Sequence, residues 1–159
     1  MIDVLIFDVE RHRYAVRADD VHAVLRATAI VPLPDAPPVV QGVIDYHGRI
    51  LPVFDLRTRF GAARRPLQAD EQFIVVLAAE RMVALRTDRA VGLVRLDDAS
   101  IHSLNAVSAA GQYVEGLATL PDGLVLIADV HAFLSASETM MLDDALGARA
   151  DHAVGAAAQ

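Results

Sequence analysis

Cysteine is absent from the 159-residue sequence, which excludes a disulfide scaffold, a thiolate metal site and a cysteine nucleophile. Basic side chains are scarce relative to acidic ones, because 14 Lys and Arg face 21 Asp and Glu, for a net charge of -7. Such a chain has no cationic cluster that could replace the counterions of a phosphate backbone. Nucleic acid is therefore not an expected partner.

Long apolar runs are also absent. No stretch of about 18 apolar residues occurs without a charge, so no helix is expected to cross a membrane. Residues 1–8 lack the basic segment and the cleavage site of a signal peptide. We therefore expect a cytoplasmic protein with no direct membrane insertion.

The motifs of common reaction centres are missing too. There is no G-x-S-x-G nucleophile elbow, no G-x-x-x-x-G-K-[ST] phosphate loop and no G-x-G-x-x-G dinucleotide loop. Histidines are scattered singly, and Asp45 and His47 form a close pair. Both would face one side of a strand, so a metal-dependent hydrolase centred on them stays an alternative, although a solvated hairpin end has the same pattern. We expect no catalytic residue, no cofactor and no bound metal.

Short apolar runs rich in Val, Ile and Leu alternate with Gly, Pro and Asp along most of the chain. This pattern is typical of short strands joined by turns, and the 54% hydrophobic content can supply a sizeable core. The expected strands are residues 4–9, 14–17, 23–26, 42–46, 49–54, 72–78, 82–86, 91–95, 116–120 and 124–128. Their spacing predicts an all-β barrel architecture.

Helix signals are fewer and follow strands. Asp55 can cap a short helix over residues 56–60, and Asp129 can cap one over residues 130–134. Ser135 and Glu138 have the spacing of a capping box, which predicts a closing helix over residues 135–146. The Ala-rich residues 147–159 are expected to form a flexible C-terminal tail.

The sequence contains an internal repeat. Residues 15–24 are similar to residues 84–93, an offset of 69, and residues 40–55 are similar to residues 114–129, an offset of 74. Because order and spacing are kept in both copies, chance alternation of apolar residues is a poor explanation. We interpret residues 1–146 as one domain that holds two related β subdomains, roughly 1–66 and 67–134, about a pseudo-twofold axis.

The hairpin over residues 42–57 carries Tyr46, His47 and Arg49 at its tip. Tyr and Arg commonly anchor protein interfaces, because they are large and can hydrogen-bond at their ends. A partner-binding tip and an ordinary exposed turn are both compatible with this composition.

This hairpin resembles the signature of the CheW family of chemotaxis coupling proteins, G-V-[IT]-N-x-R-G-x-[IV]-[IV]-P-[IV]-x-D-L-R. The positions that fit are Gly42, Val43, Ile44, Gly48, Ile50, Leu51, Pro52, Val53, Asp55, Leu56 and Arg57. Residues 14–16, 21–24, 81–96, 113–118, 124–129 and 134–143 are also similar to the family. The resemblance thus covers about residues 1–146.

The resemblance implies two SH3-like five-stranded β-barrel subdomains with short helices and a C-terminal helix. It also implies a non-catalytic adaptor that joins the helical cytoplasmic tip of a methyl-accepting chemoreceptor to the regulatory domain of a CheA-type histidine kinase, within receptor arrays at the inner membrane. The implied receptor- and kinase-binding residues are Val21, Ala23, Val24, Asp45, Tyr46, His47 and Arg49. A small-ligand sensor that uses the cleft between the subdomains stays a further alternative.

Three positions depart from the family pattern. Asp45 replaces the usual Asn of the hairpin, His47 replaces its usual Arg, and Ala23 stands where an acidic residue is frequent. A charge-paired receptor contact therefore does not carry over, because neutral His presents no bidentate fork. The Tyr-His-Gly tip resembles that of CheW homologues from alternative chemosensory pathways.

Overall fold

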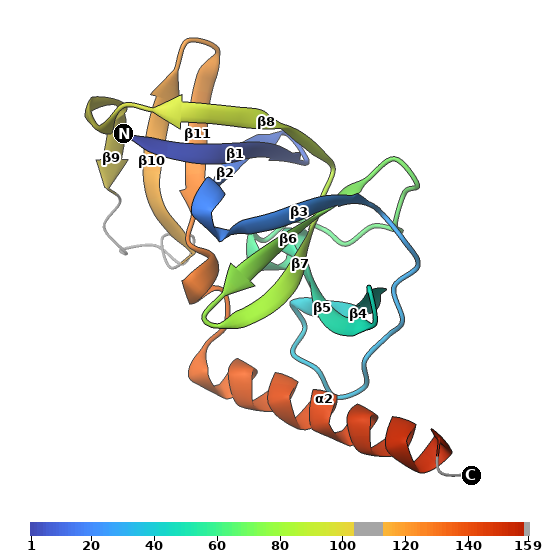
Figure 1. Cartoon of the computed structure of the whole chain (residues 1–159). Coiled ribbons are helices and arrows are strands. Elements are labelled where there is room, and N and C mark those ends of the chain that lie inside the picture. The colour runs from blue at the N-terminus through green and yellow to red at the C-terminus, as the bar shows by residue number, and fades with distance from the viewer. Residues whose placement is uncertain (104–112, 158–159) are drawn as a thin grey trace.

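The computed structural model describes residues 1–103 and 113–157. Its strands form a six-stranded sheet, in the order β8-β1-β2-β11-β10-β9, and a five-stranded sheet, in the order β3-β6-β7-β5-β4 (Figure 1). The strands are β1 (Ile2–Val9), β2 (His12–Arg17), β3 (Val21–Arg26), β4 (Val40–Tyr46), β5 (Arg49–Asp55), β6 (Gln72–Ala78), β7 (Arg81–Thr87), β8 (Arg89–Leu96), β9 (Ile101–Ser103), β10 (Val114–Leu120) and β11 (Gly123–Ala128). The helical elements are η1 (Ala18–Asp20), α1 (Leu56–Arg59), η2 (Asp98–Ser100), η4 (Val130–Ala132) and α2 (Ala136–Ala157).

The two sheets have the same internal order once the repeat is taken into account. Strands β1 to β5 of the first copy correspond to β6, β7, β8, β10 and β11 of the second. Each sheet then runs third strand, first, second, fifth, fourth, and β9 is an addition at one edge. The parallel pairs are equivalent as well, because Ile127 lies opposite Ala15 in one sheet and Val53 lies opposite Ala84 in the other. The structure therefore confirms the internal repeat and the mostly β fold.

Each sheet draws strands from both copies. The hairpin β1–β2 pairs with β8 and β11 of the second copy, and the hairpin β6–β7 pairs with β3 and β5 of the first. Neither copy can complete a sheet alone, because its first two strands and its last three lie in different sheets. The boundaries near residues 66 and 134 stay a prediction about the repeat unit, whereas each barrel combines residues from both sides of residue 66.

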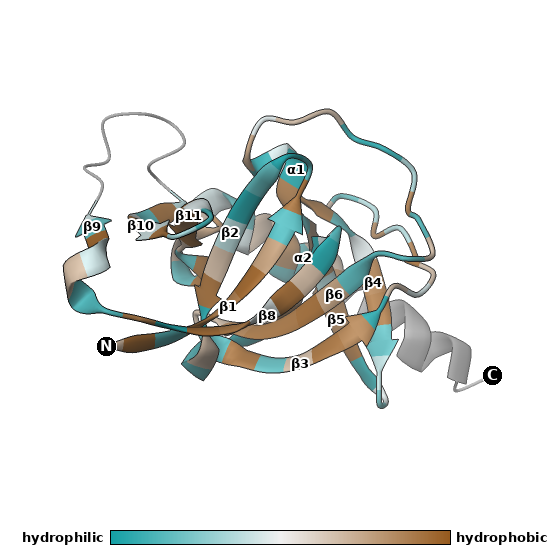
Figure 2. Ribbon diagram, turned by 90° about the horizontal axis from the view of Figure 1, so that it is seen from above, coloured by the Kyte–Doolittle hydropathy of each residue, from teal (hydrophilic) through white to brown (hydrophobic). Residues whose placement is uncertain are grey.

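Three buried apolar clusters match this arrangement. One fills the six-stranded barrel and includes Val4 and Ile6, and another fills the five-stranded barrel and includes Phe73. The largest, which we call the shared core, lies between the barrels and includes Leu5 and Phe7. Strand β1 is therefore buried on both faces, which explains its nearly continuous apolar run. Figure 2 shows hydrophobic residues concentrated on β1, β8, β3 and β6.

The predicted caps are confirmed. Asp55 accepts the Arg57 N–H at 3.1 Å to begin α1, and Asp129 accepts the His131 N–H at 3.1 Å to begin η4. The segment after Asp129 is a single 3-10 turn, Val130–Ala132, which is shorter than the expected helix over residues 130–134.

Helix α2 covers the shared core. The Glu138 N–H donates to Ser135 Oγ at 3.1 Å and the Ser135 N–H donates to Glu138 Oε1 at 3.0 Å, which is the predicted capping box. Leu142 and Ala145 are buried in the shared core. The helix continues to Ala157, beyond residue 146, because alanine has the highest helix propensity and Gly147 and Gly155 each cost only about 1 kcal/mol. The flexibility expected of residues 147–159 is a separate property and stays a prediction.

An ion pair fixes the start of α2 to the first copy. Arg59 donates to Glu138 through Nη1 at 3.0 Å and through Nη2 at 2.9 Å. These hydrogen bonds, opposed by burial and aided by the Ser135 amide, lower the pKa of Glu138 from 4.5 to about 2. The charged form of Glu138 is therefore part of the folded structure.

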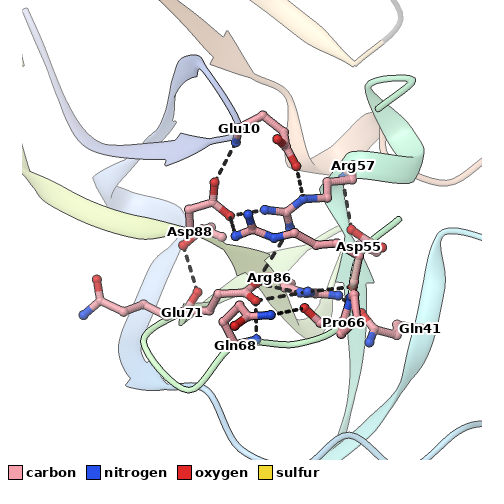
Figure 3. A network of polar contacts seen from close by, with 12 residues as sticks. Glu10, Gln41, Asp55, Arg57, Pro66, Gln68, Glu71, Arg86 and Asp88 are labelled. Carbon is pink, nitrogen blue, oxygen red and sulfur yellow. Dashed lines mark hydrogen bonds and ion pairs between the residues drawn. The ribbon is translucent and has the colours of Figure 1, made fainter. Parts of the chain in front are cut away.

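Buried ions join the two copies (Figure 3). Arg86 binds Glu71 in a bidentate pair, with Nε 2.7 Å from Oε1 and Nη2 3.1 Å from Oε2, and both side chains are 1% exposed. Arg57 is fully buried, donates through Nε to Glu10 at 2.5 Å and binds Asp88 through Nη2. Its Nη1 lies 3.7 Å from Glu71. Glu10 and Arg57 belong to the first copy and the other three to the second, so this ion network ties the copies together.

The ion network depends on Glu71 remaining charged. Burial by itself disfavours the carboxylate, but the hydrogen bonds from Arg86 and from the Gln68 amide hold the pKa of Glu71 below 4.5. Arg57 and Arg86 therefore have a buried anion between them.

We predict a pH-dependent contribution from Glu138. A carboxyl group with a lowered pKa stabilises the fold above its unfolded pKa, and that stability is lost as the pH falls from 4.5 toward about 2. At pH 7 the variant Glu138→Gln should be less stable than the wild type by about 1 kcal/mol, and this difference should shrink on acidification. Urea unfolding at a series of pH values measures it. A difference that stays constant across the series would contradict the role of the charged pair.

We also predict that Glu71→Gln lowers the free energy of unfolding by about 3 kcal/mol, because two buried guanidinium groups lose their shared anion. The matched control is Glu115→Gln, whose partner Arg17 lies 2.6 Å away in a pair that is 48% and 28% exposed. The control should cost less than about 1 kcal/mol. If urea unfolding gave the same loss of stability for Glu71→Gln and Glu115→Gln, the ion network would be dispensable.

Candidate partner-binding surface

The tip of the β4–β5 hairpin is a two-residue turn. Tyr46 lies opposite Arg49, and the residues between them, His47 and Gly48, have φ angles of 50° and 84°. Such left-handed pairs match the twist of a hairpin, and Gly48 adopts the conformation without strain. Asp45 Oδ1 accepts the Gly48 N–H at 2.8 Å, so this carboxylate shapes the turn. The side chains of His47 and Arg49 are exposed.

An aromatic cluster forms beside this turn. The Tyr46 ring lies 4.5 Å from the His47 ring and 6.0 Å from the His22 ring, with edge-to-face geometry in both pairs. His22 comes from β3, at the opposite edge of the five-stranded sheet, so curling of the sheet brings the two edges together. Sequence reasoning missed His22, because no local pattern links β3 to the hairpin tip.

Strand β3 divides the remaining predicted residues between two faces. A bulge at His22 shifts the register, so that Val21 lies opposite Val76 and Ala23 lies opposite Val75. Ala23 and Tyr46 pack against the interior of the five-stranded barrel, whereas Val21 packs against the shared core. Val24 lies opposite Ile74 of the shared core and remains 42% exposed. The structure thus brings Ala23 and Tyr46 together with His22 and places Val24 on the other face of β3.

Exposed apolar residues recur at equivalent positions of the repeat. Val24 on β3 corresponds to Leu93 on β8, at the offset of 69, and Ile50 on β5 corresponds to Leu124 on β11, at the offset of 74. These four side chains are between 42% and 71% exposed. Single exposed apolar residues are common on protein surfaces, so it is their recurrence at equivalent positions that singles out these four. The two copies therefore present similar exposed apolar side chains on their edge strands and on their hairpins.

The tip does not gather metal ligands. Across residues 1–103 and 113–157, no group of three or more His, Cys, Asp or Glu side chains could hold a metal ion. The proposed pair of Asp45 and His47 thus lacks a third ligand in that part of the chain, and Asp45 is already engaged by the turn. Among the described helices, none combines the length and the apolar character that a bilayer crossing requires.

A family model and two relatives match most of this chain. The family model described as CheW-like domain matches residues 3–138. The chemotaxis protein CheW of Thermotoga maritima is 27% identical over 136 residues, which cover 83% of this chain and 87% of the relative. The chemotaxis protein CheW of Klebsiella aerogenes is 25% identical over 146 residues, which cover 89% of this chain and 87% of the relative.

A solved structure has the same fold. The scaffolding protein TtCheW from Thermoanaerobacter tengcongensis superposes with a TM-score of 0.79 at 27% sequence identity, covering 86% of this chain and 94% of that protein. This similarity confirms the expected pair of SH3-like barrels. Because the family model and these relatives match most of its length, the chain belongs to the CheW-like domain family.

Proposed function

We propose that this protein is a non-catalytic adaptor that couples methyl-accepting chemoreceptors to a CheA-type histidine kinase in chemosensory signalling. The observation that carries the proposal is the family match over residues 3–138, which spans both barrels and the start of α2. A scaffolding protein with the same fold supports it. The adaptor acts in the cytoplasm, within receptor arrays at the inner membrane, and belongs to an alternative chemosensory pathway.

The receptor-facing surface comprises β3 and the β4–β5 tip. Val24 offers an exposed apolar side chain on one face of β3, and the rings of Tyr46, His47 and His22 form an aromatic surface at the hairpin tip. An amphipathic receptor helix can lay its apolar side on such a surface, which is a common mode of helix recognition. Val21 and Ala23 support the surface from beneath, because both are partly buried.

The contact chemistry differs from the charge-paired form that the family pattern implies. Ala23 offers no carboxylate, and His47 offers no guanidinium. Aromatic edge-to-face packing around Tyr46 occupies this place instead. The receptor that fits this surface therefore contributes apolar and aromatic groups more than a paired charge.

The kinase-facing surface comprises the outer sides of the two hairpins. Ile50 and Leu124 are 55% and 61% exposed at equivalent positions of the repeat. Arg49 lies next to Ile50, with its Nη1 3.8 Å from the sulfur of Met82. A kinase regulatory domain related to this family has the same barrels, so apolar hairpin contacts between related domains are expected.

We predict that the purified protein binds a receptor fragment and a kinase regulatory domain at the same time. Val24→Glu should weaken receptor binding about tenfold or more and leave kinase binding unchanged, because a charge would enter an apolar contact. Ile50→Glu should weaken kinase binding by a similar factor and leave receptor binding unchanged. Isothermal titration with each partner, and a pull-down with both, measure these effects.

The matched control is Met140→Glu, which adds the same charge at a 67% exposed apolar residue of α2 outside both surfaces. It should leave both affinities unchanged, and all three variants should keep the melting temperature of the wild type. Failure of both partners to bind at tens of micromolar would refute the adaptor function. Equal weakening by all three variants would refute the assigned surfaces.

A further inference from the structure

His131 connects two elements that flank the receptor-facing surface. Its Nδ1 accepts the Ala79 N–H of the β6–β7 turn at 2.9 Å, and its Nε2 lies 3.3 Å from Asp20 Oδ1 of η1. An amide can donate only to an unprotonated Nδ1, so the ring is neutral and its proton is on Nε2, from which it is donated to Asp20. We call this triple, His131, Ala79 and Asp20, the His131 latch.

Two residues of the His131 latch occupy the same repeat positions as two residues of the ion network. At the offset of 74, His131 corresponds to Arg57, and at the offset of 69, Ala79 corresponds to Glu10. Arg57 likewise bridges its hairpin turn at Glu10 and the carboxylate of Asp88. A guanidinium group stays charged at every physiological pH, whereas a histidine can gain or lose its proton between about pH 5 and pH 8. Equivalent positions thus hold a permanently charged arginine in one copy and a histidine in the other.

The turn that the latch holds is strained. Ala79 and Glu80 have φ angles of 47° and 70°, although neither is glycine. Residues other than glycine persist in this left-handed region only where surrounding contacts hold them. The hydrogen bond to His131 is such a contact, and a cavity of about 90 Å³ lined by Ala79, Arg81 and His131 leaves room for movement beside it.

Protonation of His131 would break one hydrogen bond of the latch and keep the other. With a proton on Nδ1, the ring presents a donor to the Ala79 N–H, and that hydrogen bond is lost. Asp20 still accepts from Nε2, so His131 stays beside η1 while the turn is released. The other charged groups around it are Asp129 at its own N-cap, Glu80 and Arg81 from the turn, Asp143 of α2, which pairs with Arg81, and Arg17 near Asp20 and Asp129.

We propose that His131 is a pH-sensitive latch that regulates the receptor-facing surface. Asp20 directly precedes Val21 of β3, and Ala79 directly follows β6, whose Val76 lies opposite Val21. Both ends of the latch therefore act on the β3–β6 pair at the point where the receptor-facing surface begins. Acidification releases the β6–β7 turn and weakens receptor binding. This consequence for binding rests on the proposed function, whereas the latch itself does not.

Amide hydrogen exchange in the isolated protein tests the latch. After correction for intrinsic exchange, the protection of the Ala79 amide should fall about tenfold between about pH 8 and pH 5.5, because one hydrogen bond is lost. In His131→Gln the protection should not change with pH, since the amide side chain does not titrate. Asp20→Asn should keep the response, because the bond between His131 Nδ1 and the Ala79 amide does not involve Asp20.

The control variant is His102→Gln, which removes an exposed histidine on β9 and should keep the wild-type response of Ala79. Protection that is constant in the wild type, or that falls equally in His131→Gln, would overturn the latch. Receptor-fragment affinity should fall on acidification in the wild type and not in His131→Gln. An Ala79 response without any such change would overturn the regulation of binding, and a response without receptor binding at any pH would instead refute the adaptor function.

Discussion

The exchange of hairpins between the two sequence copies is the constraint on which the rest of this structure depends. Hairpins β1–β2 and β6–β7 each complete the sheet of the opposite copy, and both contribute to the shared core. Strand β1 packs into two cores at once, so a slip in its register would disrupt close packing on both of its faces. The barrels are therefore locked together, and strand pairing fixes the positions of the outer hairpins and edge strands.

The two copies of the repeat share a backbone arrangement but differ in the side chains at equivalent positions. Equivalent turns and helical segments are clamped by Arg57 in one copy and by His131 in the other. The first clamp is buried and paired with carboxylates, so it acts as a permanent tie. The second has a half-exposed ring that shares its bonds between an amide and one carboxylate. Duplication thus supplies one position with two uses, because a fixed charge suits structural support and a titratable group suits regulation.

The proposed partner surfaces of this scaffold consist of a few exposed side chains. Apolar residues recur at equivalent positions on β3 and β8 and on the two hairpins, which gives the chain similar surfaces in two places. The aromatic cluster of His22, Tyr46 and His47 distinguishes one of them. Because the backbone beneath is fixed by strand pairing, changes at these few positions can alter partner choice without altering the fold.

Sequence alone determined the features that depend on local pattern. Alternating apolar residues located the described strands other than β9, side-chain chemistry located the caps at Asp55 and Asp129, and the similarity of two segments revealed the repeat. Tertiary structure decided which strands share a sheet, how Glu71 becomes the anion between two buried arginines, and that His22 meets Tyr46. The same holds for the bond between His131 and Ala79. These contacts join residues that are far apart in the chain, and local periodicity carries no information about which distant strands will pair.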